Sequence, residues 1–359
     1  MKKMRNSSKK ILPTVFAAII VISAFSAMCT PASAATDDEI EQAIANGMVW
    51  LSAQQNPSDG SWGDWDKVAR TGFAVLKFET HATMADLPED PFDPSYEYSD
   101  EVINGLNYIF ANANTIDINV EHGGVDDPDT NGNGIGVYFT DGGHQTYQTG
   151  IAMMAIAASA DPNRVVNVSG SPVDGWTYKD VLQDAVDYMA WGQADTGSYR
   201  GGWSYEHQDD SGSWADNSNT GYAVLGLGYA QADPPHGLGC TVPGFVKTEL
   251  NIWIDYIQND VDGDTDDGGS GYGDPWNWVN ILKTGNLLYE MGLYGDTEST
   301  PRVQDAIDYL CRHWDDPNQD PGWKGPPLHY QAMYTTMKGL EVFLIPERVF
   351  RKSIYDLKA

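Results

Sequence analysis

Basic residues are scarce in this sequence. Its 359 residues include 21 Lys and Arg but 51 Asp and Glu, which gives a formal net charge of −30. A nucleic-acid partner is not expected, because phosphate recognition needs clustered Lys and Arg, and an anionic membrane surface is disfavoured for the same reason. The acid excess does not indicate a disordered chain, since 41% of the residues are hydrophobic and predict a packed core.

Cysteine is also scarce, with three residues in the whole chain. Cys29 lies in the leader described next, so Cys240 and Cys311 are the two that follow it. Two cysteines exclude a disulfide-rich scaffold, although an oxidising compartment permits one bond between them.

The first 34 residues have the pattern of a secretory signal peptide. Five basic residues precede an apolar run from Ile11 to about Met28, and Ala32-Ser33-Ala34 is a small-x-small cleavage site. A retained membrane anchor is the alternative, because the run is almost long enough to span a bilayer. With residues 1–34 removed, 16 of the 21 basic residues remain against all 51 acidic ones, a charge of −35 and no membrane span. The sequence therefore predicts a secreted protein, extracellular or at the cell surface.

The mature chain contains an internal repeat. Each unit has an amphipathic helix, a loop rich in Gly, Trp and Asp, and a small-residue step, often Thr-Gly, that opens a second helix. Five units follow this order. Their first helices are expected near 40–51, 102–110, 181–189, 250–257 and 303–310, and their second helices from about 71, 149, 220, 284 and 331.

The two helices of a unit differ in their apolar faces. Val303, Ala306, Ile307 and Leu310 form one stripe, which is typical of an outer helix with a solvated face. The second helices are apolar almost all round, as at 222–230, and such helices are buried on every side. An inner layer of buried helices surrounded by amphipathic ones is therefore expected.

This order of helix, Gly/Trp/Asp-rich loop and Thr-Gly step resembles the repeat of the prenyltransferase and squalene-cyclase superfamily. The superfamily includes terpenoid cyclases and protein prenyltransferase β subunits. The motifs that carry the resemblance are Gly202-Trp203-Ser204-Tyr205 and Asp216-Asn217-Ser218-Asn219-Thr220. The resemblance implies an all-α fold, an (α/α) toroid of five to six helical hairpins with a central cavity. It places the toroid at 35–346 and leaves a tail at 347–359.

The chemistry of that superfamily is not intact in this sequence. Terpenoid cyclases protonate an alkene with an Asp-x-Asp-Asp motif just before an inner helix, and the matching stretch here keeps Asp216 but has Ser218 and Asn219 in place of carboxylates. Asp216 is the remaining candidate for a catalytic acid. No zinc is expected, because Cys240 and Cys311 do not precede an inner helix, where the superfamily's ligands lie.

Aromatic residues near the inner helices are the candidates for ligand contacts. Glycine-x-tryptophan loops are more often structural, since the indole fills gaps between hairpins, so a structural role is the alternative for each tryptophan. The candidate group is Trp203, Tyr205, Trp214, Trp276, Trp278, Trp323, His329 and Tyr330.

Two acidic loops resemble the first half of an EF-hand and indicate Ca²⁺ as the cofactor. Oxygen ligands alternate along both loops with glycine at the turn, and a solvated acidic loop is the alternative. The candidate ligands are Asp127, Asp129, Asn131 and Asn133 in the first loop and Asp262, Asp264 and Asp266 in the second.

Three functions remain open. The leading hypothesis is a secreted toroid that binds a small molecule or a glycan in an aromatic cavity without the superfamily's catalysis. The second is a carbohydrate-active hydrolase or lyase on the same (α/α) architecture, because carboxylates and aromatics cluster around 203–216. The third is an isoprenoid cyclase or transferase with rearranged acidic residues.

Overall fold

The computed structural model describes residues 36–84, 90–118, 126–207, 212–314, 316 and 329–344. The chain divides into two compact units, a small one that includes residues 36–49 and a large one from Trp50 to Val349. The expected signal peptide and the C-terminal tail lie outside the described residues. Within those residues, every helix is too short or too polar to cross a bilayer.

Helix α2 (Asp37–Ser52) begins with the capping box that Thr36 and Glu39 predict. The backbone N–H of Thr36 donates to Glu39 Oε2 at 2.8 Å, and the N–H of Glu39 donates to Thr36 Oγ1 at 3.3 Å. Two free donors of the first turn are thereby satisfied, and three acidic residues lie at the positive end of the helix dipole.

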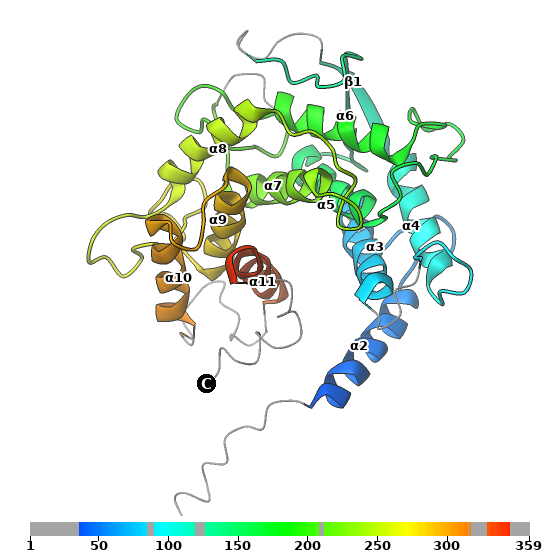
Figure 1. Ribbon diagram of the computed structural model, residues 1–359, viewed down its shortest axis with the longest axis horizontal. Helices are drawn as coiled ribbons and strands as arrows, with labels where there is room; N and C mark the ends of the chain where they lie inside the picture. The colour runs from blue at the N-terminus through cyan, green and yellow to red at the C-terminus, as the bar shows by residue number, and fades with distance from the viewer. Residues whose placement is uncertain are drawn as a thin grey trace, which may run out of the picture. The chain divides into compact units, whose positions relative to one another are not determined.

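The large unit is mostly helical, as the sequence predicts, and its helices alternate in the expected order (Figure 1). Each helix predicted from the repeat is present within a few residues of its expected position. The bounds are α3 Lys67–Met84, α4 Ser99–Ala111, α5 Gln145–Ala158, α6 Tyr178–Trp191, α7 Asn217–Gln231, α8 Gly244–Ile257, α9 Ile281–Tyr294, α10 Pro301–His313 and α11 Tyr330–Leu344.

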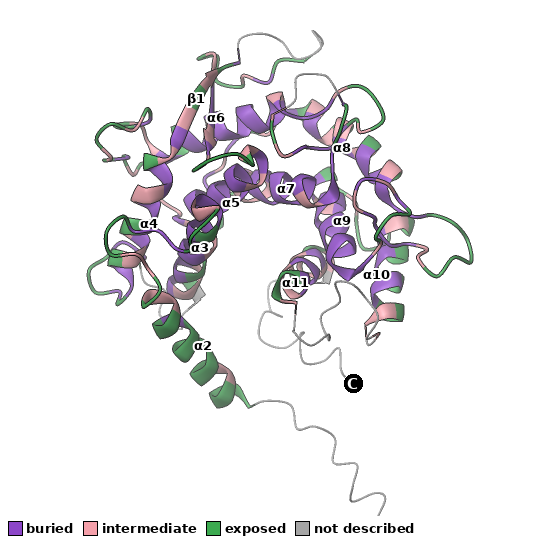
Figure 2. Cartoon of the chain, turned by 180° about the vertical axis from the view of Figure 1, so that it is seen from behind, coloured by how far each residue is buried: buried purple, intermediate pink, exposed green. Residues whose placement is uncertain are grey.

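The helices of the large unit form two layers. Helices α3, α5, α7, α9 and α11 pack against one another in that order, while α4, α6, α8 and α10 pack against the outside of this series. Figure 2 shows α5, α7 and α9 buried along most of their length, whereas α10 alternates buried and exposed residues. The difference between the two kinds of apolar pattern is therefore confirmed.

The repeated threonines form hydrogen bonds that hold each connection against the inner helix that follows it. Backbone N–H groups of the preceding connections donate to the hydroxyls of Thr71, Thr149, Thr220 and Thr284 at 3.0–3.1 Å, and all four threonines are buried. An apolar side chain in this position would leave a buried N–H without an acceptor, so the loop sequence and the threonine are needed together.

The glycine after each threonine allows the next inner helix to approach. A side chain at Gly72 would meet Ile151 of α5, and one at Gly150 would meet the backbone of Tyr222 in α7. Gly221 and Gly285 have the same relation to α9 and to α11. The Thr-Gly pair therefore joins a helix to its own loop and to its neighbour, which explains why it recurs along the chain.

A β-hairpin interrupts the second repeat, which the sequence analysis did not predict. Strand β1 (Ala113–Asp117) pairs antiparallel with β2 (Ile135–Phe139), with Ala113 opposite Phe139 and Asp117 opposite Ile135. Val137 and Phe139 are buried and β2 packs on α6, so burial of their side chains holds this short ribbon in place.

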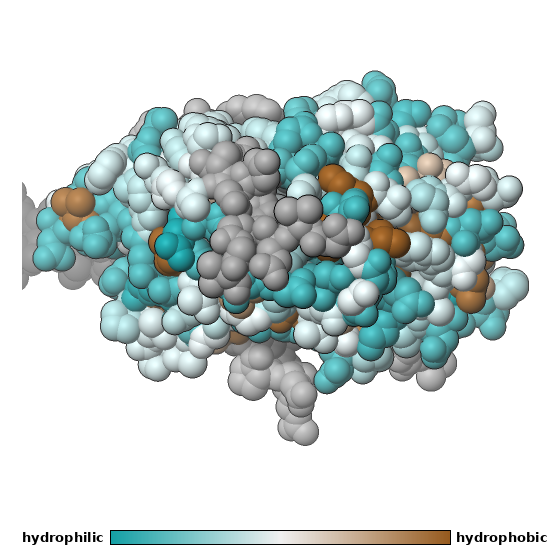
Figure 3. Space-filling view, turned by 90° about the horizontal axis from the view of Figure 1, so that it is seen from above, coloured by the Kyte–Doolittle hydropathy of each residue, from teal (hydrophilic) through white to brown (hydrophobic). Residues whose placement is uncertain are grey.

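The surface is largely hydrophilic, as the excess of acidic residues in the composition predicts. Hydrophilic side chains cover most of the face shown in Figure 3, and hydrophobic ones lie between them in small groups. Cys240 is buried and Cys311 is exposed, and both are free thiols, so the disulfide that export would permit is absent.

Candidate ligand-binding cavity

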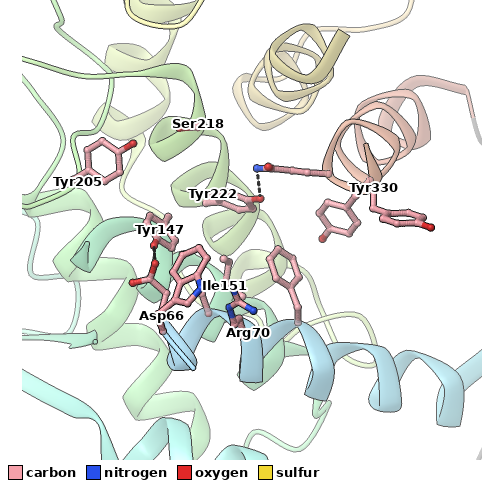
Figure 4. Close-up of a pocket in the computed structure, with 13 residues that line it drawn as sticks. Asp66, Arg70, Tyr147, Ile151, Tyr205, Ser218, Tyr222 and Tyr330 are labelled. Carbon is pink, nitrogen blue, oxygen red and sulfur yellow. Dashed lines mark hydrogen bonds between the residues drawn. The ribbon is translucent and has the colours of Figure 1, made fainter. Parts of the chain in front are cut away.

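A cavity of about 580 Å³ lies among the N-terminal parts of inner helices in the large unit (Figure 4). Helices α3, α5, α7 and α11 contribute to its wall, together with residues of the loops that precede α3 and α7. Seven of its lining residues are aromatic: Trp65, Phe73, Tyr147, Tyr205, Tyr222, Tyr330 and Tyr334. The other lining residues include Asp66, Arg70, Ser218 and Gln331, so charged and polar groups are few among many rings.

The rings form a connected wall. The ring of Phe73 on α3 lies 5.9 Å from Tyr222 on α7 and 5.5 Å from Tyr334 on α11, edge to face in both cases. Gln331 Nε2 donates to Tyr222 Oη at 2.9 Å, and burial raises the pKa of Tyr222 to about 12. These contacts fix the rings in place, so the cavity has a preformed aromatic surface.

Asp66 is the acidic residue of the cavity, and its carboxylate is held by α5. Tyr147 Oη donates to Asp66 Oδ2 at 2.5 Å, and Gln148 Nε2 donates to Oδ1 at 3.2 Å. The ring Nδ1 of His144 lies 3.4 Å from Oδ1. Burial, and then the bond to Asp66, raise the pKa of Tyr147 above its usual value, so the phenol keeps its proton.

The backbone of this cluster is strained. Asp66 has φ +44° and His144 has φ +53°, a left-handed conformation that non-glycine residues seldom adopt. Each such residue costs about 1–3 kcal/mol, and such strain is concentrated at functional sites. Two strained residues whose side chains meet therefore mark this end of the cavity as a functional candidate.

Arg70 is the cationic residue of the cavity. Its guanidinium carbon lies 4.2 Å from the centre of the Trp65 ring, within the range of a cation–π contact. On its other side the backbone of Gly63 is so close that any side chain there would collide with Arg70 Cδ. Arg70 is nevertheless exposed, so its charged head is accessible from the cavity.

Of the aromatic candidates chosen from the sequence, Tyr205 and Tyr330 line the cavity and the other described ones do not. Trp203 is buried, and its indole donates to the carbonyl of Met189 at 2.9 Å, which is the structural role considered for the Gly-x-Trp loops. His329 Nδ1 accepts from the N–H of Ala332 at the start of α11. Trp323 lies outside the described residues.

Two of the remaining candidates, Trp214 and Trp278, belong to a second aromatic group beside the cavity. Trp214 packs on Tyr199 with ring centres 5.3 Å apart, and Trp278 lies under the ammonium of Lys283 at 3.7 Å. Trp276 is 67% exposed. Tyr272 lies 5.8 Å from the ring of Trp278, and its hydroxyl meets that of Tyr205 at 2.8 Å. The bond between these two hydroxyls joins this group to the cavity wall.

Asp216 is the N-cap of α7 and does not line the cavity. It is buried, and its carboxylate accepts from the N–H groups of Ser218 and Asn219 at 2.9 and 3.0 Å, from the Ser218 hydroxyl and from the Asn219 amide. Four donors on one carboxylate account for its burial without any catalytic role.

The first acidic loop folds onto α6. Asp129 accepts the N–H groups of residues 132–134, and Asp127 accepts the N–H of Asp129. The side-chain amides of Asn131 and Asn133 donate to Asp184, a buried carboxylate of α6. The loop is therefore held on α6 by hydrogen bonds to the buried carboxylate of Asp184.

The second acidic loop is more exposed. Asp264 accepts the N–H of Asp266, and Asp262 faces solvent. Within the described part of the chain, no group of three or more His, Cys, Asp and Glu side chains is placed to hold a metal ion. Calcium at either loop therefore stays a prediction.

Sequence reasoning missed Asp66, Arg70, Tyr147, His144 and Tyr222. Their position in the sequence could have identified them, because these residues lie in the first two turns of inner helices or just before them. Asp66 precedes Thr71 much as Asp216 precedes Thr220. The indoles of the Gly-x-Trp loops at Trp62 and Trp203 are buried, so the sequence feature that stands out most marks the packing between helices instead of the cavity.

Comparison with known proteins assigns no family, since no family model matches the chain. A segment of 45 residues is 40% identical to the large ribosomal subunit protein uL16c of Gnetum parvifolium. The match covers 12% of this chain and 34% of that protein, about a third of its length. A match of 45 residues is too short to assign the fold of this chain or the residues of its cavity.

Proposed function

We propose that this chain is an exported ligand-binding protein, an (α/α) toroid of the terpenoid-cyclase and prenyltransferase type, that holds a small molecule or a glycan in its aromatic cavity. The observation that carries the proposal is the cavity itself, about 580 Å³ with seven aromatic residues in its wall. Ligand sites commonly have volumes of roughly 300–1,000 Å³ and apolar walls with a few polar groups.

The toroid is supported by contacts between the first and last inner helices of the large unit. Phe73 of α3 meets Tyr334 of α11, although 260 residues separate them in the chain. A ring contact between the first and last members of a sequential array of helices is expected where the array curves back on itself. The hairpins α4–α5, α6–α7, α8–α9 and α10–α11 supply the repeating units of the proposal.

The absence of the superfamily's catalysis is supported at α7. Asp216 is fully engaged as a helix cap, and Ser218 and Asn219 occupy the positions of the missing carboxylates. An acid that protonates an alkene must be held in its protonated form beside the substrate. Asp216 instead accepts four hydrogen bonds from Ser218 and Asn219 and does not line the cavity, so it is not placed beside a substrate there.

A second candidate function is a carbohydrate-active enzyme, and the Asp66 cluster favours it. His144 contacts Asp66 Oδ1 through its ring at 3.4 Å, and its backbone N–H donates to Glu206 Oε1 at 3.2 Å. Two carboxylates are thus held on opposite sides of one residue beside aromatic rings. Sugar chemistry uses such pairs of carboxyl groups and a stacking platform.

Mass spectrometry of molecules retained by the purified protein tests the binding proposal. A bound organic molecule that is released on denaturation, or uptake of an added ring-bearing probe at one molecule per chain, is the expected result. Protein that retains nothing and takes up no probe contradicts the proposal. Turnover of oligosaccharides that is lost in Asp66→Asn, with probe uptake unchanged, would replace the binding function by the enzymatic one.

A further inference from the structure

We propose that the ligand of this cavity is an organic anion with a ring, in which a carboxylate pairs with Arg70 while the ring packs on the aromatic wall. This inference rests on the proposed function, because it concerns the class of ligand that the same cavity binds. It starts from the charge of the chain, where acidic residues outnumber basic ones by 51 to 21. A cation exposed to a cavity is unexpected against that background.

The geometry around Arg70 presents its charge to the cavity. Trp65 covers one face of the guanidinium at 4.2 Å, and the backbone of Gly63 supports the aliphatic stem. Figure 4 shows Arg70 on α3, near the labelled side chains of Asp66 and Ile151. A stacked guanidinium keeps the N–H donors of its edge free, and this planar fork matches the two oxygens of a carboxylate.

The nearest carboxylate does not neutralise Arg70. Asp66, one helical turn before Arg70, takes its hydrogen bonds from Tyr147 and Gln148 instead. Among the described residues no acidic side chain forms an ion pair with the Arg70 guanidinium. The charge is therefore held in place by contacts with a ring and with the backbone, and a ligand can supply its counter-ion.

A second cation lies on the same side of α3. Lys77 follows Arg70 by two helical turns, with Phe73 between them. Lys338 of α11 approaches Lys77, and burial together with this second ammonium lowers the pKa of Lys77. Lys338 itself pairs with Glu341 at 3.0 Å, so its charge is already balanced. Lys77 and Lys338 are not among the residues of the cavity wall, so the proposed anion is assigned to Arg70 alone.

Ring and charge together define the ligand class. The aromatic wall offers flat surfaces for a ring, and Arg70 lies at its edge, so one molecule can use both. A hexuronic acid and an aromatic carboxylic acid share this chemistry. Neutral rings use the wall alone and lack the charge-assisted hydrogen bonds, which are about twice as strong as neutral ones.

The test compares two fluorescent probes with the same ring system, 8-anilino-1-naphthalenesulfonate and the uncharged N-phenyl-1-naphthylamine, on the purified full chain. The anionic probe is expected to bind at least about tenfold more tightly, the effect of a bidentate pair with arginine. Arg70→Gln is expected to remove this difference, and Arg70→Lys to keep part of it. Arg164→Gln is the matched control, because Arg164 also stacks on a ring, that of Phe92 at 3.6 Å, but does not line the cavity.

Each outcome separates this inference from the proposed function. Equal affinity for the two probes, unchanged in Arg70→Gln, overturns the anionic ligand and leaves the aromatic cavity as a binding site. Absence of binding by both probes overturns both proposals. Displacement of the anionic probe by a hexuronate trisaccharide supports an acidic glycan, and displacement by 1-naphthoate supports an aromatic acid. Failure of both competitors contradicts a carboxylate ligand.

Discussion

Tyr147 donates its phenolic hydrogen to Asp66 across 2.5 Å, and this bond joins α5 to the residue that precedes α3. It is the shortest of the three contacts that hold the Asp66 carboxylate, the others being with Gln148 and His144. The bond therefore has two consequences, since it fixes two neighbouring inner helices and orients the one acidic side chain that lines the cavity among the described residues.

Tyr147→Phe removes this bond while it keeps the ring. We expect the free energy of unfolding to fall by about 1–2 kcal/mol, because a hydrogen bond to a charged group is lost and the carboxylate keeps weaker partners. Denaturant unfolding measures the change. Tyr138→Phe is the control, since the Tyr138 ring stacks on Tyr188 and its hydroxyl has no hydrogen-bond partner within the described residues. Equal stability of both variants would show that the Asp66 bond contributes nothing.

Gly150→Ala tests the packing of successive inner helices. A methyl group there would collide with the backbone of Tyr222, so α5 and α7 would have to separate, at a cost of about 1–3 kcal/mol. Gly228→Ala is the matched control, because Gly228 lies in the neighbouring inner helix α7 and has open space around the new carbon. That variant is expected to gain up to about 1 kcal/mol of helix propensity. A Gly150→Ala protein that is as stable as wild type would contradict the predicted close packing of α5 and α7.

Glu79 predicts a dependence of stability on pH. It is buried on α3, both of its carboxyl oxygens lack a hydrogen-bond partner among the described residues, and burial raises its pKa well above the usual value. The unfolded carboxyl has a pKa of about 4.3, so above that pH the folded chain holds a proton that the unfolded chain releases. The stability of the folded chain therefore falls as pH rises towards the folded-state pKa.

Glu79→Gln mimics the protonated group and removes this dependence. We expect urea unfolding to show a gap between the variant and wild type that widens in favour of the variant from about pH 5 to about pH 8. Glu298→Gln, a change at an exposed residue, is expected to follow wild type at every pH. A constant gap between Glu79→Gln and wild type would mean that Glu79 does not hold a proton in the folded chain.

Calcium is expected to stabilise the loop over α6. Saturating Ca²⁺ should raise the melting temperature by about 2 °C or more, since a ligand that binds the folded state at ten times its Kd adds roughly 1.4 kcal/mol. Asp129→Asn should abolish the shift, and Asp264→Asn reports on the second loop in the same way. No shift of wild type at saturating Ca²⁺ would exclude a structural ion.

Much of the fold could be predicted because the repeat recurs in the residues that pack. Thr220 and Gly221 occur as a pair since one binds the loop and the other admits the next helix, and both constraints appear in the sequence as residue types. The hairpin of β1 and β2 has no comparable recurring residue pattern in the sequence. Its strands are short, and they lie inside a connection between two predicted helices.

The cavity could be predicted only in part, because periodicity shows which residues are buried but not which of them face a void. Trp62 and Trp65 are three residues apart, yet Trp62 is buried and donates to the carbonyl of Leu51, whereas Trp65 lines the cavity. Tyr205 and Tyr330 were found because they flank inner helices. Arg70 was not, since a single basic residue gives no pattern until α3 and α5 are in place.

The affinity of a ring-bearing probe for Trp65→Ala and Trp276→Ala tests the central claim most directly. Both tryptophans are largely exposed, at 64% and 67%, but Trp65 lines the cavity and Trp276 does not. We expect Trp65→Ala to weaken binding of N-phenyl-1-naphthylamine by about tenfold or more, as the loss of a large aromatic contact implies, and Trp276→Ala to leave it unchanged. Unaltered binding in Trp65→Ala, or a greater loss in Trp276→Ala, would contradict a ligand site in this cavity.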